Sequence, residues 1–154
     1  MSTLTGIGQK TLTFELAEAI SKFNIIDIGN LLKENGEFMT LDEKDERVVS
    51  SKDDFIKWIS NCFDEFKAAN EDRNKLDYTI DQCLHCRIGN PVIIFENGRF
   101  PVFTRETYER EKCGMMLEFG DDLISDISFC YFFLITDNPF NFERECTRRY
   151  GVNK

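Results

Sequence analysis

The chain has 154 residues, of which 42% are hydrophobic, 31% are charged and 15 are phenylalanine, and its net charge is −9. This composition predicts one globular domain over 1–154 and argues against a disordered chain or a membrane-spanning helix. The acidic balance argues against binding to nucleic acid or to an anionic membrane, because both require a basic patch. Segment 1–10 lacks the features of a secretory signal, so we expect a cytoplasmic location.

Helical periodicity marks the beginning of the chain. Apolar residues within 12–23 recur at helical spacing, with charged residues on the opposite side. Asn24, followed three residues later by Asp27, predicts the start of a second helix. That helix should end at the Asn-Gly pair at 35–36, because glycine adopts the left-handed conformation at low cost.

A short strand pair and a long helix follow. Segments 37–41 and 47–50 predict the two strands, which flank an acidic turn. Ser51 with Asp54 is a helix-start signal, and the helix should run over about 51–68. Its apolar side chains are mostly aromatic and recur at helical spacing: Phe55, Trp58, Ile59, Cys62, Phe63 and Phe66. We therefore expect this helix to pack an aromatic face on the core.

The second half of the chain has the alternation of strands. We expect strands over 78–84, 91–95, 110–119 and 123–134, and a hairpin at Asn97-Gly98 whose returning strand covers 99–104. Segment 135–154 is expected to be a short C-terminal extension with one last helix. Helices followed by strands predict an α+β fold, in which the N-terminal helices pack on the concave face of a curled antiparallel sheet.

Two segments carry a resemblance to a known family. Residues 114–133, GMMLEFGDDLISDISFCYFF, resemble the closing hairpin of the nuclear transport factor 2-like (SnoaL-like) superfamily. Residues 23–32, FNIIDIGNLL, resemble its second-helix entry, with Asp27 at the position of the usual acid. The resemblance implies a cystatin-like cone with a pocket between sheet and helices, and a homodimer through the outer sheet face. It implies no single activity, because the fold hosts isomerases, cyclases, dehydratases and transport factors.

Strand parity predicts which side chains face that pocket, because neighbouring residues on a strand point to opposite faces. The candidates are Tyr78 and Gln82 on the first long strand, Cys113 and Met115 on the next, and Ser125, Phe129 and Tyr131 on the last, with Trp58 reaching in from the long helix. This face is mostly apolar with a few polar groups, which is typical of a site for a small hydrophobic ligand. A core filled by its own side chains has the same pattern.

The segment Cys83-Leu84-His85-Cys86 allows two interpretations with a chemical role, a zinc site and a redox pair of thiols. Thiolates and imidazole are zinc ligands, but a second ligand pair is missing, and on an extended strand Cys83 and Cys86 point to opposite faces. A redox Cys-x-x-Cys pair normally opens a helix, whereas β-like residues follow here. We therefore expect no metal and no cofactor, with the thiols incidental to a strand.

The same parity places Asp81, His85 and Arg87 on the outer face of the sheet. That face is too polar for a core, so we expect a two-fold homodimer that sets it against its copy. Asp81 of one chain would then meet Arg87 or His85 of the other.

Three hypotheses about function remain open. The first is a small-molecule-binding or interaction module without chemistry, and we assign it no catalytic residue. The alternative is an enzyme of isomerase, cyclase or hydratase type that uses the same pocket, and a second alternative is a zinc-stabilised protein. An ionisable group buried among Phe and Met side chains would favour the enzyme, and a filled cone would favour the module.

Overall fold

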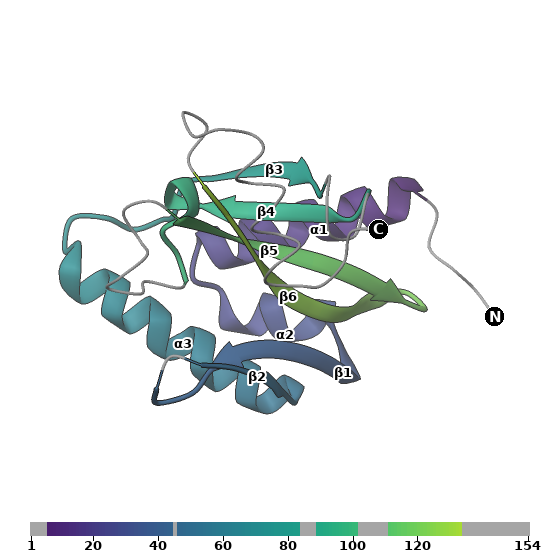
Figure 1. The fold of residues 1–154 in the computed structure, drawn as a ribbon, viewed down its shortest axis with the longest axis horizontal. Coiled ribbons are helices and arrows are strands. Elements are labelled where there is room, and N and C mark those ends of the chain that lie inside the picture. Colours follow the sequence, from purple (N-terminus) through teal and green to yellow (C-terminus); the bar gives the residue numbers. More distant parts are fainter. Residues whose placement is uncertain (1–5, 45, 84–88, 102–110, 134–154) are drawn as a thin grey trace.

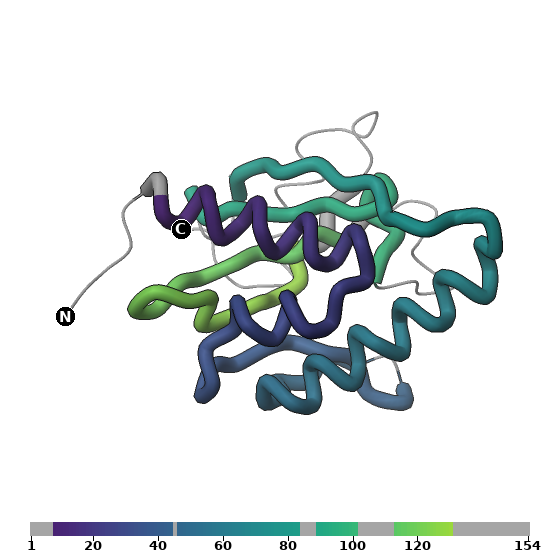
Figure 2. Tube along the Cα trace, turned by 180° about the vertical axis from the view of Figure 1, so that it is seen from behind, coloured from purple at the N-terminus to yellow at the C-terminus, as the bar shows by residue number. Residues whose placement is uncertain are grey.

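Three helices cover one face of a six-stranded sheet in the computed structural model, which describes residues 6–44, 46–83, 89–101 and 111–133 (Figure 1 and, from the helix side, Figure 2). The helices are α1 (Gly6–Ser21), α2 (Ile25–Leu31) and α3 (Lys52–Ala69). The strands are β1 (Leu32–Leu41), β2 (Arg47–Ser50), β3 (Tyr78–Gln82), β4 (Pro91–Phe95), β5 (Glu111–Gly120) and β6 (Leu123–Phe133), and a 3₁₀ turn, η1 (Glu96–Gly98), follows β4. The expected α+β class is confirmed.

The strand order is β2-β1-β6-β5-β4-β3, and one ladder departs from the expected antiparallel sheet. β1 runs parallel to β6, whereas all the other neighbouring strands of the sheet are antiparallel. The register of β1 against β6 shifts between Leu32 and Glu37. Gly36 lies within this shift, and a Cβ atom there would sit 2.5 Å from the backbone oxygen of Ser125. A side chain at this position would therefore force the two strands apart.

The second helix is shorter than the periodicity predicts. α2 ends at Leu31, and Leu32 already belongs to β1, where it pairs with Ile124 of β6 and is fully buried. The Asn-Gly pair at 35–36 lies inside β1 instead of ending a helix. The apolar residues before it satisfy a helical repeat, but pairing with a strand far along the chain determines the conformation.

Both expected helix starts are present. The Asn24 side chain accepts a hydrogen bond of 3.0 Å from the backbone N–H of Asp27, and the Ser51 hydroxyl accepts one of 3.2 Å from the N–H of Asp54. The buried face of α3 is formed by four of the six predicted residues, Phe55, Ile59, Phe63 and Phe66, while Trp58 and Cys62 are only partly buried. These side chains join a core under the concave face of the sheet, where most of the large residues are fully buried.

The turn after β4 differs from a two-residue hairpin. Glu96 and Asn97 both have positive φ values, of 52° and 59°, and the chain tightens into η1 before a single bridge joins Phe95 to Phe100. The rest of the expected returning strand, 102–104, lies outside the described residues. So does the expected C-terminal extension at 135–154 with its helix.

A second, smaller apolar cluster occupies the opposite, convex face of the sheet. It consists of Cys83, Val92, Met116 and Cys130, with Ile94 packed against it. These four side chains are only 5–6% exposed in the single chain. No helix in the described part of the chain is long and apolar enough to cross a membrane.

Candidate functional site

Three of the side chains that we expected to line a pocket on the concave face are buried in the core. Cys113 is 1% exposed, and Met115 and Phe129 are 0% exposed. A side chain on the wall of a cavity wide enough for water would retain exposed surface, so these three contact only other protein atoms. Burial also raises the pKa of the Cys113 thiol, which therefore stays protonated and unreactive at neutral pH.

Tyr78 faces the helices from the edge strand β3. Its hydroxyl donates a hydrogen bond of 2.5 Å to Oε2 of Glu18 on α1, and Lys22 pairs with the same carboxylate at 3.1 Å. Burial, followed by the bond to Glu18, raises the pKa of Tyr78 to about 12, and the bond from Tyr78 lowers the pKa of Glu18. The phenol thus stays protonated and the carboxylate charged near neutral pH, so the pair holds α1 to the sheet and neither group is poised to transfer a proton.

Two expected pocket residues lie elsewhere. β6 has a bulge, because Asp126 pairs with Glu118 and Ile124 with Phe119, which leaves Ser125 as the extra residue. The bulge reverses the parity, so Ile124 takes the buried position that we expected for Ser125. Gln82 is exposed, and its backbone N–H donates to Oδ1 of Asp81 at 2.8 Å. The side chain of Tyr131 lies outside the described part of the structure.

Trp58 is half-buried and lines a groove at the rim of the core. Its ring packs on Phe55 at 6.0 Å and on Phe129 at 5.5 Å between ring centroids. The groove has a volume of about 390 Å³ and is lined by Leu41, Asp42, Glu43, Trp58, Asn61, Cys62, Glu65 and Pro101. Burial, with a smaller contribution from the charge of Glu65, raises the pKa of the Cys62 thiol to about 12. This thiol is therefore no nucleophile at neutral pH.

A second groove, of about 410 Å³, lies between α1 and α2 and is lined by Phe14, Glu15, Glu18, Ala19, Lys22, Asn24, Asp27, Asn30 and Leu31. Its charged groups are largely engaged with one another. Glu18 pairs with Lys22, and the Asn24 amide donates to Asp27 at 2.8 Å. This groove therefore presents fewer unpaired groups to a ligand than the groove beside Trp58.

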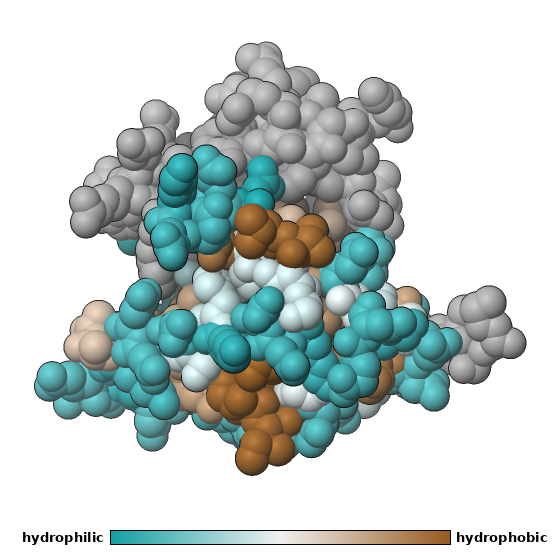
Figure 3. All heavy atoms as spheres, turned by 90° about the horizontal axis from the view of Figure 1, so that it is seen from below, coloured by the Kyte–Doolittle hydropathy of each residue, from teal (hydrophilic) through white to brown (hydrophobic). Residues whose placement is uncertain are grey.

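Exposed apolar side chains are scattered over the described surface. The large ones are Phe14, Ile26, Val48, Val49 and Ile80. Figure 3 views the side that carries α3, β1 and β2, and its hydrophobic patches are separated by hydrophilic atoms. Isolated apolar groups of this kind are normal on a soluble surface, so they mark no broad docking face.

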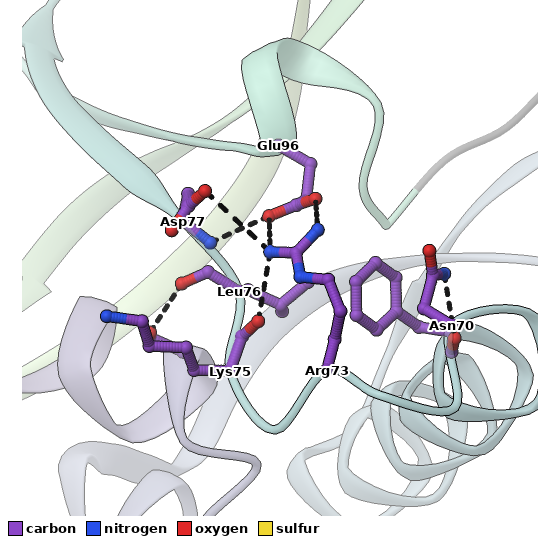
Figure 4. A network of polar contacts seen from close by, with 8 residues as sticks. Asn70, Arg73, Lys75, Leu76, Asp77 and Glu96 are labelled. Carbon is purple, nitrogen blue, oxygen red and sulfur yellow. Dashed lines mark hydrogen bonds and ion pairs between the residues drawn. The ribbon is translucent and has the colours of Figure 1, made fainter.

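An ion pair that the sequence analysis did not identify fixes the connection between α3 and β3 (Figure 4). The Arg73 guanidinium donates to both oxygens of Glu96, at 2.6 and 2.7 Å, and the backbone N–H of Asp77 donates to Oε2 of Glu96 at 2.7 Å. Arg73 also lies over the ring of Phe66, 5.2 Å from its centroid. These contacts tie the 70–77 connection to η1, so their role is structural.

The expected outer-face and metal residues fall partly outside the described residues, which exclude His85, Cys86 and Arg87. Asp81 is exposed and pairs with Val92, whose side chain belongs to the convex cluster, so Asp81 faces the convex side. Cys83 is buried in that cluster. Among the described residues, no three His, Cys, Asp or Glu side chains come together as metal ligands. The expected absence of a zinc site and the expected dimer both stay predictions.

Reversing the charge of Arg87 tests the dimer. If Asp81 of one chain meets Arg87 of its copy, the Arg87→Glu substitution sets two like charges against each other and weakens the dimer without unfolding the chain. Sedimentation equilibrium of both proteins at tens of micromolar measures the effect, and circular dichroism checks the fold. A wild-type protein that sediments as a monomer would contradict the dimer itself.

Comparisons with known proteins show similarity of fold alone. No protein-family model matches the sequence, and no curated protein matches it. An NTF2-like protein from Anabaena variabilis superposes with a TM-score of 0.50 at 9% identity, over 90% of this chain and 99% of that chain. An NTF2-like protein of unknown function from Cytophaga hutchinsonii matches with a TM-score of 0.47 at 12% identity, over 85% and 94% of the two chains. A putative ketosteroid isomerase from Kribbella flavida matches with a TM-score of 0.46 at 12% identity, over 86% and 84%.

Proposed function

Because this chain has the nuclear transport factor 2-like (SnoaL-like) fold, we propose that it is a small-molecule-binding or interaction module that performs no chemistry inside its cone. The observation that supports this most directly is the packing of the described side chains at the centre of the concave face. Met115 and Phe129, on the two central strands β5 and β6, have no exposed surface. A ligand that enters the cone would have to displace them, whereas grooves on the outside of the core are open.

The buried polar groups of the described core support the same proposal. Apart from the protonated thiol of Cys113, they are hydroxyls, on Thr13, Ser21 and Thr40, and each hydroxyl has a partner. Thr13 donates to the carbonyl of Gln9 at 2.7 Å, Ser21 donates to the carbonyl of Leu76 at 2.5 Å, and Thr40 shares a 2.7 Å bond with Ser50. Isomerases and cyclases need an acid or base with a shifted pKa beside the substrate, and a hydroxyl bonded to a backbone carbonyl cannot supply one.

Benzene tests whether the cone is closed. In protein labelled at its methionine methyl groups, adding benzene should leave the Met115 resonance unchanged, because no space beside it admits the solute. In Phe129→Ala the vacated volume should admit benzene and shift that resonance, as engineered apolar cavities do. Met116, on the opposite face of the same strand, is the internal control, and Phe129→Leu replaces the variant if Phe129→Ala does not fold. A Met115 shift in the wild-type protein would refute the proposal and favour an enzyme that uses the cone.

A further inference from the structure

The groove beside Trp58 has two walls from segments far apart in the sequence. One wall is a single face of α3, because Trp58, Asn61, Cys62 and Glu65 follow one another at helical spacing. The other wall is the end of β1, Leu41, with the turn residues Asp42 and Glu43, and Pro101 borders it. The turn is held in shape by Oδ1 of Asp42, which accepts hydrogen bonds of 2.8 and 2.9 Å from the backbone N–H groups of Lys44 and Glu46.

The charge in this groove is not balanced. Among the described residues that line it, three are carboxylates, Asp42, Glu43 and Glu65, and none is a lysine or arginine. Glu43 and Glu65 are exposed, and within the described part of the chain neither forms an ion pair. The negative charge of Glu65 acts on the groove itself, since it contributes to the raised pKa of Cys62.

The indole of Trp58 is the second component of the groove. Contacts with Phe55 and Phe129 hold its ring in place while the residue keeps part of its surface open to the groove. Trp is the aromatic side chain that attracts cations most strongly, through the negative potential over its ring. Carboxylates on a surface bind nothing specific by themselves, but here a hollow and a fixed aromatic ring give a cation a defined place.

We propose that this groove binds a small organic cation, an ammonium or guanidinium group on a compact apolar body, with its charge over Trp58 and facing Glu43 and Glu65. The volume of about 390 Å³ lies in the range of small-molecule sites, which starts at roughly 300 Å³. Leu41, Pro101 and the aliphatic part of α3 suit an apolar body, and the carboxylates exclude an anion. The inference rests on the proposed function and names the ligand class for it.

Trp58 is the single tryptophan of the chain, so the tryptophan component of its fluorescence comes from this groove alone. Titration with choline chloride, at an ionic strength held constant with sodium chloride, should give a saturable change in Trp58 emission. The neutral carbon analogue of choline, in which a quaternary carbon replaces the nitrogen, should bind at least about two- to fivefold more weakly, since a cation over an exposed ring is worth roughly 0.5–1 kcal/mol.

Removing one carboxylate tests whether the charge of the groove itself, and not a nonspecific effect of salt, holds the cation. Glu65→Gln should weaken choline binding by about two- to fivefold, whereas Asp64→Asn, an equal charge change on the same helix outside the groove lining, should leave it unchanged. Equal binding of the neutral analogue, equal effects of the two variants, or no saturable change at tens of millimolar choline would overturn the inference. If choline does not bind and benzene leaves the Met115 resonance unchanged, only the ligand class is wrong and the proposed binding module stands. If benzene shifts the Met115 resonance, the proposed module is refuted, whatever the groove binds.

Discussion

Replacing Phe63 by alanine should lower the free energy of unfolding by about 3–5 kcal/mol. Phe63 is 2% exposed, and its ring packs edge-on against Phe23 at 5.1 Å and stacks on Phe100 at 5.9 Å. It thereby joins three segments: α3, the connection between α1 and α2, and the chain beyond η1. The loss combines the transfer free energy of the ring with a cavity that these segments cannot close.

Urea denaturation of both proteins measures this loss. Lys57→Ala on the exposed side of the same helix is the matched control, and it should change the unfolding free energy by no more than about 0.5 kcal/mol. A cost below about 1 kcal/mol for Phe63→Ala would mean that this face of α3 is not core.

Replacing Glu96 by glutamine should lower the free energy of unfolding by about 1–2 kcal/mol at neutral pH. Glu96 is 14% exposed and accepts two hydrogen bonds from Arg73 and one from the N–H of Asp77. A glutamine keeps the shape but removes the charge and one acceptor, so a guanidinium bond is lost. Arg73 is 35% exposed, and solvent screening therefore keeps the cost below that of a fully buried ion pair.

The same substitution should change how stability depends on pH. The hydrogen bonds from Arg73, and then the backbone N–H of Asp77, lower the pKa of Glu96 below its ordinary value of 4.5. The folded protein therefore binds this proton more weakly than the unfolded chain. The stability that the charged Glu96 carboxylate contributes is complete above its pKa in the unfolded chain. It is lost as the pH falls through its pKa in the folded protein.

The difference in unfolding free energy between wild type and Glu96→Gln should therefore shrink between pH 7 and pH 3. Urea denaturation at both values measures it, with the exposed Glu71→Gln as the control whose effect stays small throughout. A difference that is the same at both pH values would show that Glu96 does not act through its charge.

Local signals in the sequence were sufficient for the elements that rely on local interactions. The helix α3 lies within one residue of the predicted 51–68 at each end, because the residues that cap it and the aromatic residues that repeat along it are all local in the sequence. The β5–β6 hairpin is also close to prediction, since alternation and the tight turn at 120–122 define it. Parity placed Met115 and Phe129 on the concave face for the same reason.

Features that depend on distant partners could not be predicted this way. Leu32 fits the helical repeat of the residues before it, and only its pairing with β6 makes it part of a strand. The alternation expected along β6 gives no sign of the bulge at Ser125. Arg73 and Glu96 stand 23 residues apart in two connections, so no spacing rule relates them. The groove beside Trp58 could not be predicted, because it depends on where the turn at 42–43 lies in three dimensions. Whether the cone is filled depends on how side chains from several elements fit together, which the sequence does not show.

The parallel ladder between β1 and β6 has a consequence for folding during synthesis. The helices and the β1–β2 hairpin leave the ribosome well before residues 123–133 exist, and the inner edge of β1 has its partner only when β6 arrives. Without β6, the remaining strands fall into two separate groups, β1 with β2 and β3 with β4 and β5. We therefore expect the nascent chain to expose the edge of β1 and the aromatic side chains of the core until β6 has been made, which is the stage at which it is most prone to aggregate.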